Sequence, residues 1–273
     1  MKVVLFCGGQ GMRLRGYADD MPKPMVAIGN RPILWHIMKY YAHFGHKEFI
    51  LCLGYKGNHI KDYFLHYDES VSNDFVWSKG GKSVEFLNRD IDDWTITFVE
   101  TGDNANIGER LKAVEPYLKD EEIFLANYGD GLSDVPLPPM LESFKQSNAI
   151  ASLLLVQPTA SFDIVHANAE GKVTDVCALS RSDIWINGGF LQLRREIFEY
   201  LYPGEELVRE PFQRLIEKQA LLAYKYTGFW QCMDTFKDKQ RLDELNTGAA
   251  PWKIWGPGAS PVPSAPQVIT VRP

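Results

Sequence analysis

The sequence predicts an α/β fold in which a mixed, mostly parallel central sheet is flanked by helices. Apolar runs bounded by turn residues alternate with longer segments of helical period, the pattern of successive βα units. Residues 2–7 (KVVLFC) are typical of a buried strand, and residues 31–45 place Ile33 and Ile37 on one helical face before Gly45 ends the helix. A second unit follows, with a strand at 48–55 and a helix at 57–67.

The later segments continue this alternation. Residues 83–87 and 94–101 are expected as an antiparallel pair or as edge strands. The other expected elements are a short helix at 107–118, strands at 121–128, 149–156 and 185–194, an amphipathic helix at 211–224, and a last helix within 229–246. We expect residues 1–256 to form a single domain and the Pro/Gly-rich residues 257–273 to be a flexible tail or to drape over a neighbouring subunit.

Composition excludes several classes of protein. The 273 residues are 45% hydrophobic and 23% charged, which suits a globular protein with a sizeable core. A formal net charge of -6 argues against a surface devoted to nucleic acid, and no run approaches the roughly 20 apolar residues of a membrane span. The four cysteines (Cys7, Cys52, Cys177 and Cys232) are far apart without metal-type spacing, so we expect reduced thiols in a cytoplasmic protein.

A glycine-rich stretch follows the first strand. Gly-Gly-x-Gly-x-Arg at residues 8–13 lets backbone N–H groups close around a phosphate, but it also suits a tight turn, and it matches neither common nucleotide-binding glycine motif. Lys23, between Pro22 and Pro24, adds a second cation on a restricted segment, although a solvated turn lysine remains an alternative. Two cations, Arg13 and Lys23, beside a glycine loop favour a polyphosphate ligand.

Two carboxylates are candidates for a metal site. Asp130 follows an apolar strand, at the edge where open α/β sheets bind ligands, although Asp-Gly is also a common turn pair. Asp234 precedes the last helix, where it could equally be an N-cap. If the fold brings the two together, they would suit Mg²⁺.

The chain resembles the sugar nucleotidyltransferase family from residue 1 to about 255, and most closely the branch that transfers a cytidylyl group to glucose 1-phosphate. The motifs that carry the resemblance occur in the family's order: GGQGMRL, KPM, RPILWHIMKYY, LGYKG, TGDNANIGERLKAV, YGDG, INGGF, EP at 210–211, GFWQCMDT and APWKIW. ILWHIMK, the GFW and MDT motifs, and APWK with its following Trp point to the cytidylyl branch. The resemblance implies a Rossmann-like nucleotidyltransferase fold.

It also implies a reaction. An oxygen of the sugar phosphate would attack the α-phosphorus of CTP in line and expel pyrophosphate, with Mg²⁺ as cofactor and a CDP-sugar as product. Such a displacement depends on positioning and charge neutralisation and needs no protein nucleophile. The family supplies precursors of cell-surface polysaccharides and tends to form homo-oligomers, so CTP, a sugar phosphate and further copies of the chain are the expected partners.

Roles carried over from the family fall on matching positions. Arg13, Lys23 and Asp130 would be catalytic, with Arg13 on the leaving pyrophosphate, Lys23 on the phosphates under attack, and Asp130 and Asp234 on the metal. The nucleotide would be bound by the following residues: Phe6, Cys7, Gly8, Gly9, Gln10, Gly11, Met12, Arg13, Lys23, Thr101, Asn104, Arg110 and Gly129. Asn187, Gly188 and Glu210 match positions near the sugar, although Asn187 and Gly188 could merely turn the chain and Glu210 could simply begin a helix. Trp35 and His36 are expected to be core or interface residues, and Phe229 and Trp230 are expected in the core, although these last two could line the sugar pocket.

The sequence expected to contact the acceptor phosphate differs from the family pattern. Ala178, Leu179 and Ser180 stand where members commonly carry Glu-Lys-Pro, whose lysine contacts the acceptor phosphate, and Arg181 is the nearest replacement. A second departure is Met12, where the family often has threonine. Three hypotheses follow: a cytidylyltransferase acting on glucose 1-phosphate; the same chemistry on another acceptor, such as a sugar phosphorylated away from C1 or a polyol phosphate; or a catalytically weak nucleotide-binding protein.

Overall fold

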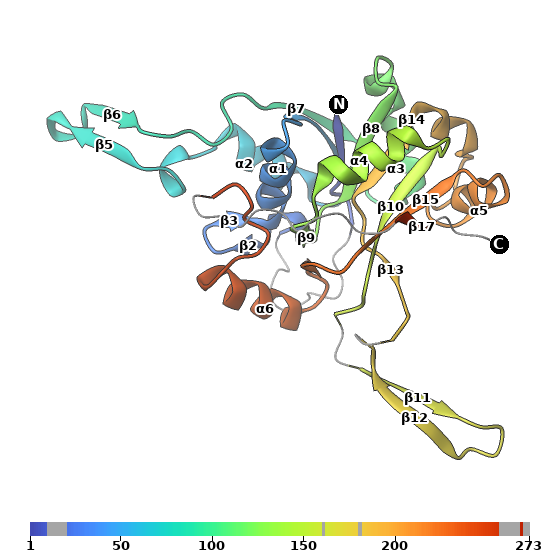
Figure 1. Ribbon diagram of the computed structural model, residues 1–273. Coiled ribbons are helices and arrows are strands. Elements are labelled where there is room, and N and C mark those ends of the chain that lie inside the picture. Colours follow the sequence, from blue (N-terminus) through green and yellow to red (C-terminus); the bar gives the residue numbers. More distant parts are fainter. Residues whose placement is uncertain (10–20, 160–161, 180–181, 257–267, 270–273) are drawn as a thin grey trace.

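The structure of the protein is a computed structural model, which describes residues 1–9, 21–159, 162–179, 182–256 and 268–269 (Figure 1). Within these residues the central sheet has nine strands, in the order β17-β15-β10-β14-β8-β1-β4-β7, with β13 beside β10. The strands are β1 Val3–Phe6, β4 Glu48–Leu53, β7 Thr95–Glu100, β8 Ile123–Tyr128, β10 Ala151–Val156, β13 Ile186–Asn187, β14 Leu191–Arg194, β15 Leu221–Tyr226 and β17 Val268–Ile269. β8, β1, β4 and β7 run parallel, while β14 is antiparallel to β8 and β10, so the predicted mixed α/β sheet is confirmed.

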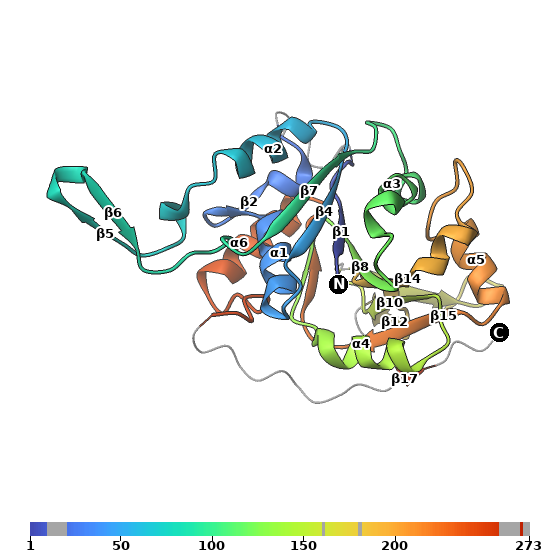
Figure 2. The ribbon, with the colours of Figure 1, turned by 90° about the horizontal axis from the view of Figure 1, so that it is seen from above.

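Helices cover both faces of this sheet (Figure 2). They are α1 Ile33–His43, α2 Gly57–Leu65, α3 Ile107–Val114, α4 Leu137–Gln146, α5 Glu210–Glu217 and α6 Phe236–Thr247, and the 3-10 turns are Lys23–Met25, Glu69–Val71, Lys79–Gly81, Glu115–Leu118 and Arg195–Tyr200. Because side chains alternate along a strand, Val3 and Leu5 of β1 pack in the core with α1, whereas Val4 and Phe6 pack in the core with α3 and α5. None of the described helices is long and apolar enough to cross a membrane.

One sequence-based expectation was wrong, and another was decided in favour of its alternative. Residues 83–87 do not pair with residues 94–101: β6 Ser83–Phe86 pairs with β5 Phe75–Ser78, and β7 lies parallel to β4 at the sheet edge, as the edge-strand alternative had it. The helix expected at 211–224 ends at Glu217, because Gln219 has a positive φ of 54° and the next residues pair as β15 with β10. The apolar run at 221–224 suited a buried strand as well as a helix, and only the neighbouring strand decided between them.

Two hairpins project from the body, and both leave apolar side chains in solvent (Figure 1). One is β5–β6. The other joins β11 Asp163–Ala167 to β12 Val173–Ala178. Two further short ribbons, β2 Ala27–Ile28 with β3 Arg31–Pro32 and β9 Gly131–Ser133 with β16 Trp230–Cys232, lie against the body.

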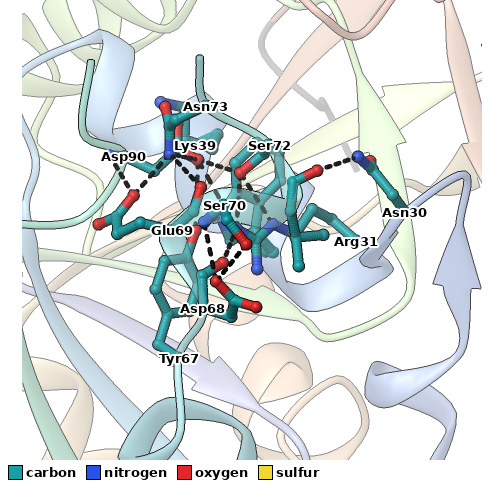
Figure 3. Close-up of polar contacts among 12 residues, drawn as sticks. Asn30, Arg31, Lys39, Tyr67, Asp68, Glu69, Ser70, Ser72, Asn73 and Asp90 are labelled. Atoms are coloured by element: carbon teal, nitrogen blue, oxygen red, sulfur yellow. Dashed lines mark hydrogen bonds and ion pairs between the residues drawn. The ribbon is translucent and has the colours of Figure 1, made fainter. Parts of the chain in front are cut away.

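A buried arginine holds the base of the β5–β6 arm (Figure 3). Arg31, 2% exposed, donates to the Asp68 carbonyl oxygen at 2.7 Å and to Ser72 Oγ at 2.6 Å, on the chain entering the arm. On the chain leaving it, Asp90 accepts a hydrogen bond from Lys39 of α1 at 3.2 Å and one from Asn73 at 3.0 Å. Both ends of the arm are therefore tied to β3 and α1 by charge-assisted hydrogen bonds.

Candidate active site

Lys23 lies between the two predicted metal carboxylates. Its Nζ is 2.6 Å from Asp130 Oδ2 and 2.5 Å from Asp234 Oδ1, and its side chain is 15% exposed. Pro22 precedes and Pro24 follows it in a 3-10 turn, so the backbone that aims the side chain is restricted. The three residues that the sequence grouped by chemistry are therefore neighbours in space.

The β9–β16 ribbon brings the two aspartates together. Asp130 directly precedes β9, and Cys232, two residues before Asp234, pairs with Gly131 in the antiparallel register. Met233 N donates to the Asp130 carbonyl oxygen at 2.9 Å, which closes the ribbon at the site. Asp234 is not the cap of the last helix: Thr235 is the N-cap of α6, in a capping box with Asp238.

The two neighbouring carboxylates change the pKa of Lys23. Burial lowers the pKa of Lys23, but the charge and hydrogen bond of Asp130, followed by those of Asp234, outweigh that effect and raise the pKa overall. Among the described residues, the ammonium of Lys23 lies between these two carboxylates. Carboxylate oxygens are the ligands that Mg²⁺ prefers, and the donor set therefore fits the metal expected from the sequence.

Arg110 supports the backbone where β1 and β4 end. The guanidinium, 2% exposed, donates to the carbonyl oxygens of Gly8 at 2.9 Å and Leu53 at 3.2 Å and to Thr101 Oγ1 at 2.6 Å. A Cβ on Gly8 would lie 2.1 Å from this guanidinium, so the position has no room for another residue. Burial lowers the pKa of Arg110. The close approach of Arg110 favours a glycine at this position, whether or not a phosphate binds there.

A cleft of about 370 Å³ opens beside Lys23 and Asp130. The sequence-predicted residues that line it are Phe6, Gly8, Gly9, Lys23, Asn104, Arg110, Gly129 and Asp130. Cys7 and Thr101 do not line the cleft: Cys7 is buried, and Thr101 accepts a hydrogen bond from Arg110, which does line it. Gln10, Gly11, Met12 and Arg13 lie outside the described residues.

A second cleft of about 920 Å³ borders Asp234. Its walls come from four parts of the chain: the base of the β11–β12 hairpin, Ile186 of β13, residues 228–232, and α6 with the two residues before it. Two cations of α6, Lys237 and Arg241, line it, and sequence reasoning missed both. Their spacing of four residues, directly after the MDT motif, was the available signal, because it places them on one helix face.

The expected sugar-side residues divide into two groups. Asn187 donates to the Tyr128 hydroxyl at 3.1 Å, and the Gly188 carbonyl oxygen accepts from Trp230 Nε1 at 2.9 Å, so Asn187 contacts a residue of the first cleft and Gly188 a residue of the second. Glu210 lines neither cleft; it begins α5, and its carboxylate accepts from Glu206 N at 3.3 Å. Ser180 and Arg181 lie outside the described residues. Trp35 and His36 are buried in the core, as expected, where Trp252 of the APWKIW motif packs on His36.

Comparison with known proteins identifies the family of the chain. A family model described as nucleotidyl transferase matches residues 2–177, and the chain belongs to that family. It is 39% identical over 258 residues, covering 93% of this chain and 100% of the relative, to glucose-1-phosphate cytidylyltransferase of Salmonella typhimurium. It is also 27% identical to D-glycero-alpha-D-manno-heptose 1-phosphate guanylyltransferase of Campylobacter jejuni, covering 79% of this chain and 88% of that one.

Solved structures share the fold. HddC from Yersinia pseudotuberculosis superposes with a TM-score of 0.62 at 21% identity, over 89% of this chain and 98% of that one. A UDP-glucose pyrophosphorylase complexed with UDP-glucose superposes with a TM-score of 0.65 at 14% identity, over 90% of this chain and 98% of the other. The expected Rossmann-like nucleotidyltransferase fold is therefore confirmed.

Proposed function

We propose that the protein transfers CMP from CTP to glucose 1-phosphate and releases pyrophosphate, giving a CDP-sugar. The observation that carries the proposal is the ion triad of Lys23, Asp130 and Asp234 at the meeting point of two clefts. The identity to a glucose-1-phosphate cytidylyltransferase over nearly the whole chain supports the choice of nucleotide and sugar.

The first cleft would take CTP. The backbone at Gly8 and Gly9 would face the nucleotide, with Arg13 on the pyrophosphate that leaves. Arg110 is a positioning residue here, because its guanidinium is occupied by Gly8, Leu53 and Thr101 and holds the strand ends in place. Asn104 lines the cleft and would contact the nucleotide.

Asp130 and Asp234 would hold Mg²⁺, which when bound neutralises the charge of the phosphates. A phosphate oxygen of the acceptor forms the new bond to the α-phosphorus as the bond to pyrophosphate breaks. Lys23 stabilises the negative charge that develops on the equatorial oxygens.

The second cleft would take the acceptor, with Lys237 and Arg241 supplying positive charge that the missing Glu-Lys-Pro lysine would otherwise provide. Both side chains line the cleft that Asp234 borders, so an anionic acceptor there would adjoin the metal carboxylates. Arg181, outside the described residues, remains part of this proposal as a further cation.

The test is to incubate the protein with CTP, Mg²⁺ and a panel of phosphorylated acceptors and to follow pyrophosphate release. The panel includes glucose 1-phosphate, sugars phosphorylated away from C1 and polyol phosphates. We expect the fastest turnover with glucose 1-phosphate, and none in Asp130→Asn, which keeps the shape of the side chain but removes its charge. Turnover in Asp130→Asn would contradict the metal assignment.

A second candidate function is the same transfer to a different phosphorylated acceptor. Residues 178–180 favour it, because the lysine that the family uses on the acceptor phosphate is absent and the cations lie on α6 instead. Preference for another acceptor in the panel would support this candidate. CTP binding without turnover on any acceptor would instead indicate a nucleotide-binding protein.

We also propose that the protein acts in the cytoplasm as a homo-oligomer that makes precursors of cell-surface polysaccharide. Self-association is supported by the β5–β6 arm, where Phe75 and Trp77 are 40% and 62% exposed. Light scattering of the intact protein, compared with Trp77→Ser, tests it: the variant is expected to have a smaller molar mass, and a monomeric wild type would contradict the proposal.

A further inference from the structure

The β11–β12 hairpin carries a group of metal-ligating side chains far from the sheet edge. It projects away from the body as two strands alone (Figure 1). An isolated two-stranded hairpin is at best marginally stable, so a hairpin of this kind needs a further source of order. Its turn is organised locally: Asn168 Oδ1 accepts hydrogen bonds from Glu170 N at 3.1 Å and Lys172 N at 2.9 Å.

Three ligand types share one face of this hairpin. His166 of β11 pairs directly with Asp175 of β12, and Cys177 follows two residues later on β12, so its side chain points to the same face. One ligand atom from each residue lies within 4.8 Å of the other two. Cys177 is half-buried, whereas His166 and Asp175 are exposed. The spacing of the four cysteines in the sequence had suggested no metal site, and only the strand register brings Cys177 to His166 and Asp175.

We propose that His166, Asp175 and Cys177 form a binding site for a thiophilic divalent cation such as Zn²⁺. A nitrogen, an oxygen and a sulfur donor suit zinc, whereas Mg²⁺ prefers oxygen ligands alone. Zinc lies about 2.0–2.3 Å from each donor atom, so small side-chain rotations bring all three atoms onto one ion. The site is therefore chemically distinct from the pair of carboxylates at Asp130 and Asp234.

Occupation of this site would cross-link the two strands at a point near the second cleft. β12 continues into Leu179, whose N–H donates to the Phe162 carbonyl oxygen at 2.9 Å, and Phe162 lines that cleft. The bound ion would thus order the hairpin and, through its base, one wall of the second cleft. The inference depends on the hairpin register and not on the proposed function.

Cobalt titration of the full chain tests the proposal, with excess Mg²⁺ present to occupy oxygen-only sites. Co²⁺ bound to a thiolate gives a ligand-to-metal charge-transfer band that carboxylates and imidazoles do not give. The matched control is Cys232→Ser, because Cys232 Sγ lies 3.7 Å from Asp234 Oδ2 and is the other half-buried thiol beside a carboxylate. We expect the band in the wild type and in Cys232→Ser, and its loss in Cys177→Ser.

Zinc affinity, measured by chelator competition, should fall by more than roughly tenfold in His166→Gln, in line with the cost of disturbing metal sites. Amide hydrogen exchange of residues 163–178 should slow when Zn²⁺ is added to the wild type and not when it is added to His166→Gln. Absence of the cobalt band in the wild type, or a band that survives in Cys177→Ser and disappears in Cys232→Ser, would overturn the proposal. Far-ultraviolet circular dichroism shows whether each variant keeps the fold.

Discussion

The ammonium nitrogen of Lys23 lies 2.6 Å from Oδ2 of Asp130, although the two residues are separated by 107 positions in the chain. With Asp234 on its other side, Lys23 is the one described cation in contact with both candidate metal ligands. Its place between them makes it sensitive to any change in their charge.

Replacing Lys23 by Met should therefore reduce kcat strongly. We expect a loss of about 100-fold or more, which is typical for a group that stabilises developing negative charge. Initial rates of pyrophosphate release measure the effect. Lys239→Met is the matched control, since Lys239 pairs with Asp243 on α6 and lines neither cleft; a loss of similar size there would contradict the role given to Lys23.

Gly8→Ala should disturb the first cleft. Its Cβ would meet the Arg110 guanidinium at 2.1 Å and its central carbon at 2.2 Å, and overpacking of a buried site costs roughly 1–3 kcal/mol. The free energy of unfolding and the KM for CTP report the two consequences. For the free energy of unfolding, Gly9→Ala is the control, because no heavy atom lies within 4 Å of its added Cβ, and equal destabilisation of both variants would count against the steric explanation.

The α6 cations should act on the acceptor and not on the nucleotide. Removing either Lys237 or Arg241 by mutation to Ala should raise the KM for the sugar phosphate about tenfold, the effect of one lost charge-assisted hydrogen bond. The KM for CTP should stay unchanged. Lys239→Ala again serves as the control. A rise in the KM for CTP alone would show that Lys237 and Arg241 bind the nucleotide, which would contradict the prediction.

Stability should fall on mild acidification because of His36. Burial lowers its pKa from 6.5 to about 4, so the folded protein holds the ring neutral, whereas the unfolded chain gains a proton below pH 6.5. The contribution of His36 is present above pH 6.5 and is lost as the pH falls toward 4. Between about pH 7.5 and 5 the expected loss is roughly 2 kcal/mol in urea unfolding. In His36→Gln, the free energy of unfolding should depend less on pH in this range. The same dependence on pH in the variant and the wild type would contradict the role given to His36.

Arg31→Met should destabilise the protein by roughly 2–3 kcal/mol, because it leaves the Asp68 carbonyl oxygen and Ser72 without a buried charged donor. Urea denaturation measures this change. Arg89→Met is the control: Arg89 pairs with Asp92 in solvent, and its loss should leave the unfolding midpoint where it was. A stable Arg31→Met protein would show that the arm is held by other contacts.

Local patterns were sufficient to identify most of the secondary structure. The strand at 2–7 and the helix that follows Pro32 depend on residue types and spacing that are present in the chain itself, as does the hypothesis that Asp130 and Asp234 share a metal site. The sequence failed where the same residues suited two structures. Leu221–Tyr226 became a strand because β10 lay beside it, and Ser83–Phe86 found its partner in Phe75–Ser78.

The tertiary structure alone decided which distant groups meet. The β9–β16 register placed Asp234 beside Asp130 and Lys23. The position of α6 brought Lys237 and Arg241 to the second cleft. The β11–β12 register put His166 opposite Asp175. The sequence determined what each side chain can do, because charge, size and backbone preference are local properties. Distances between side chains depend on strand pairing and helix packing, which are properties of the whole folded chain.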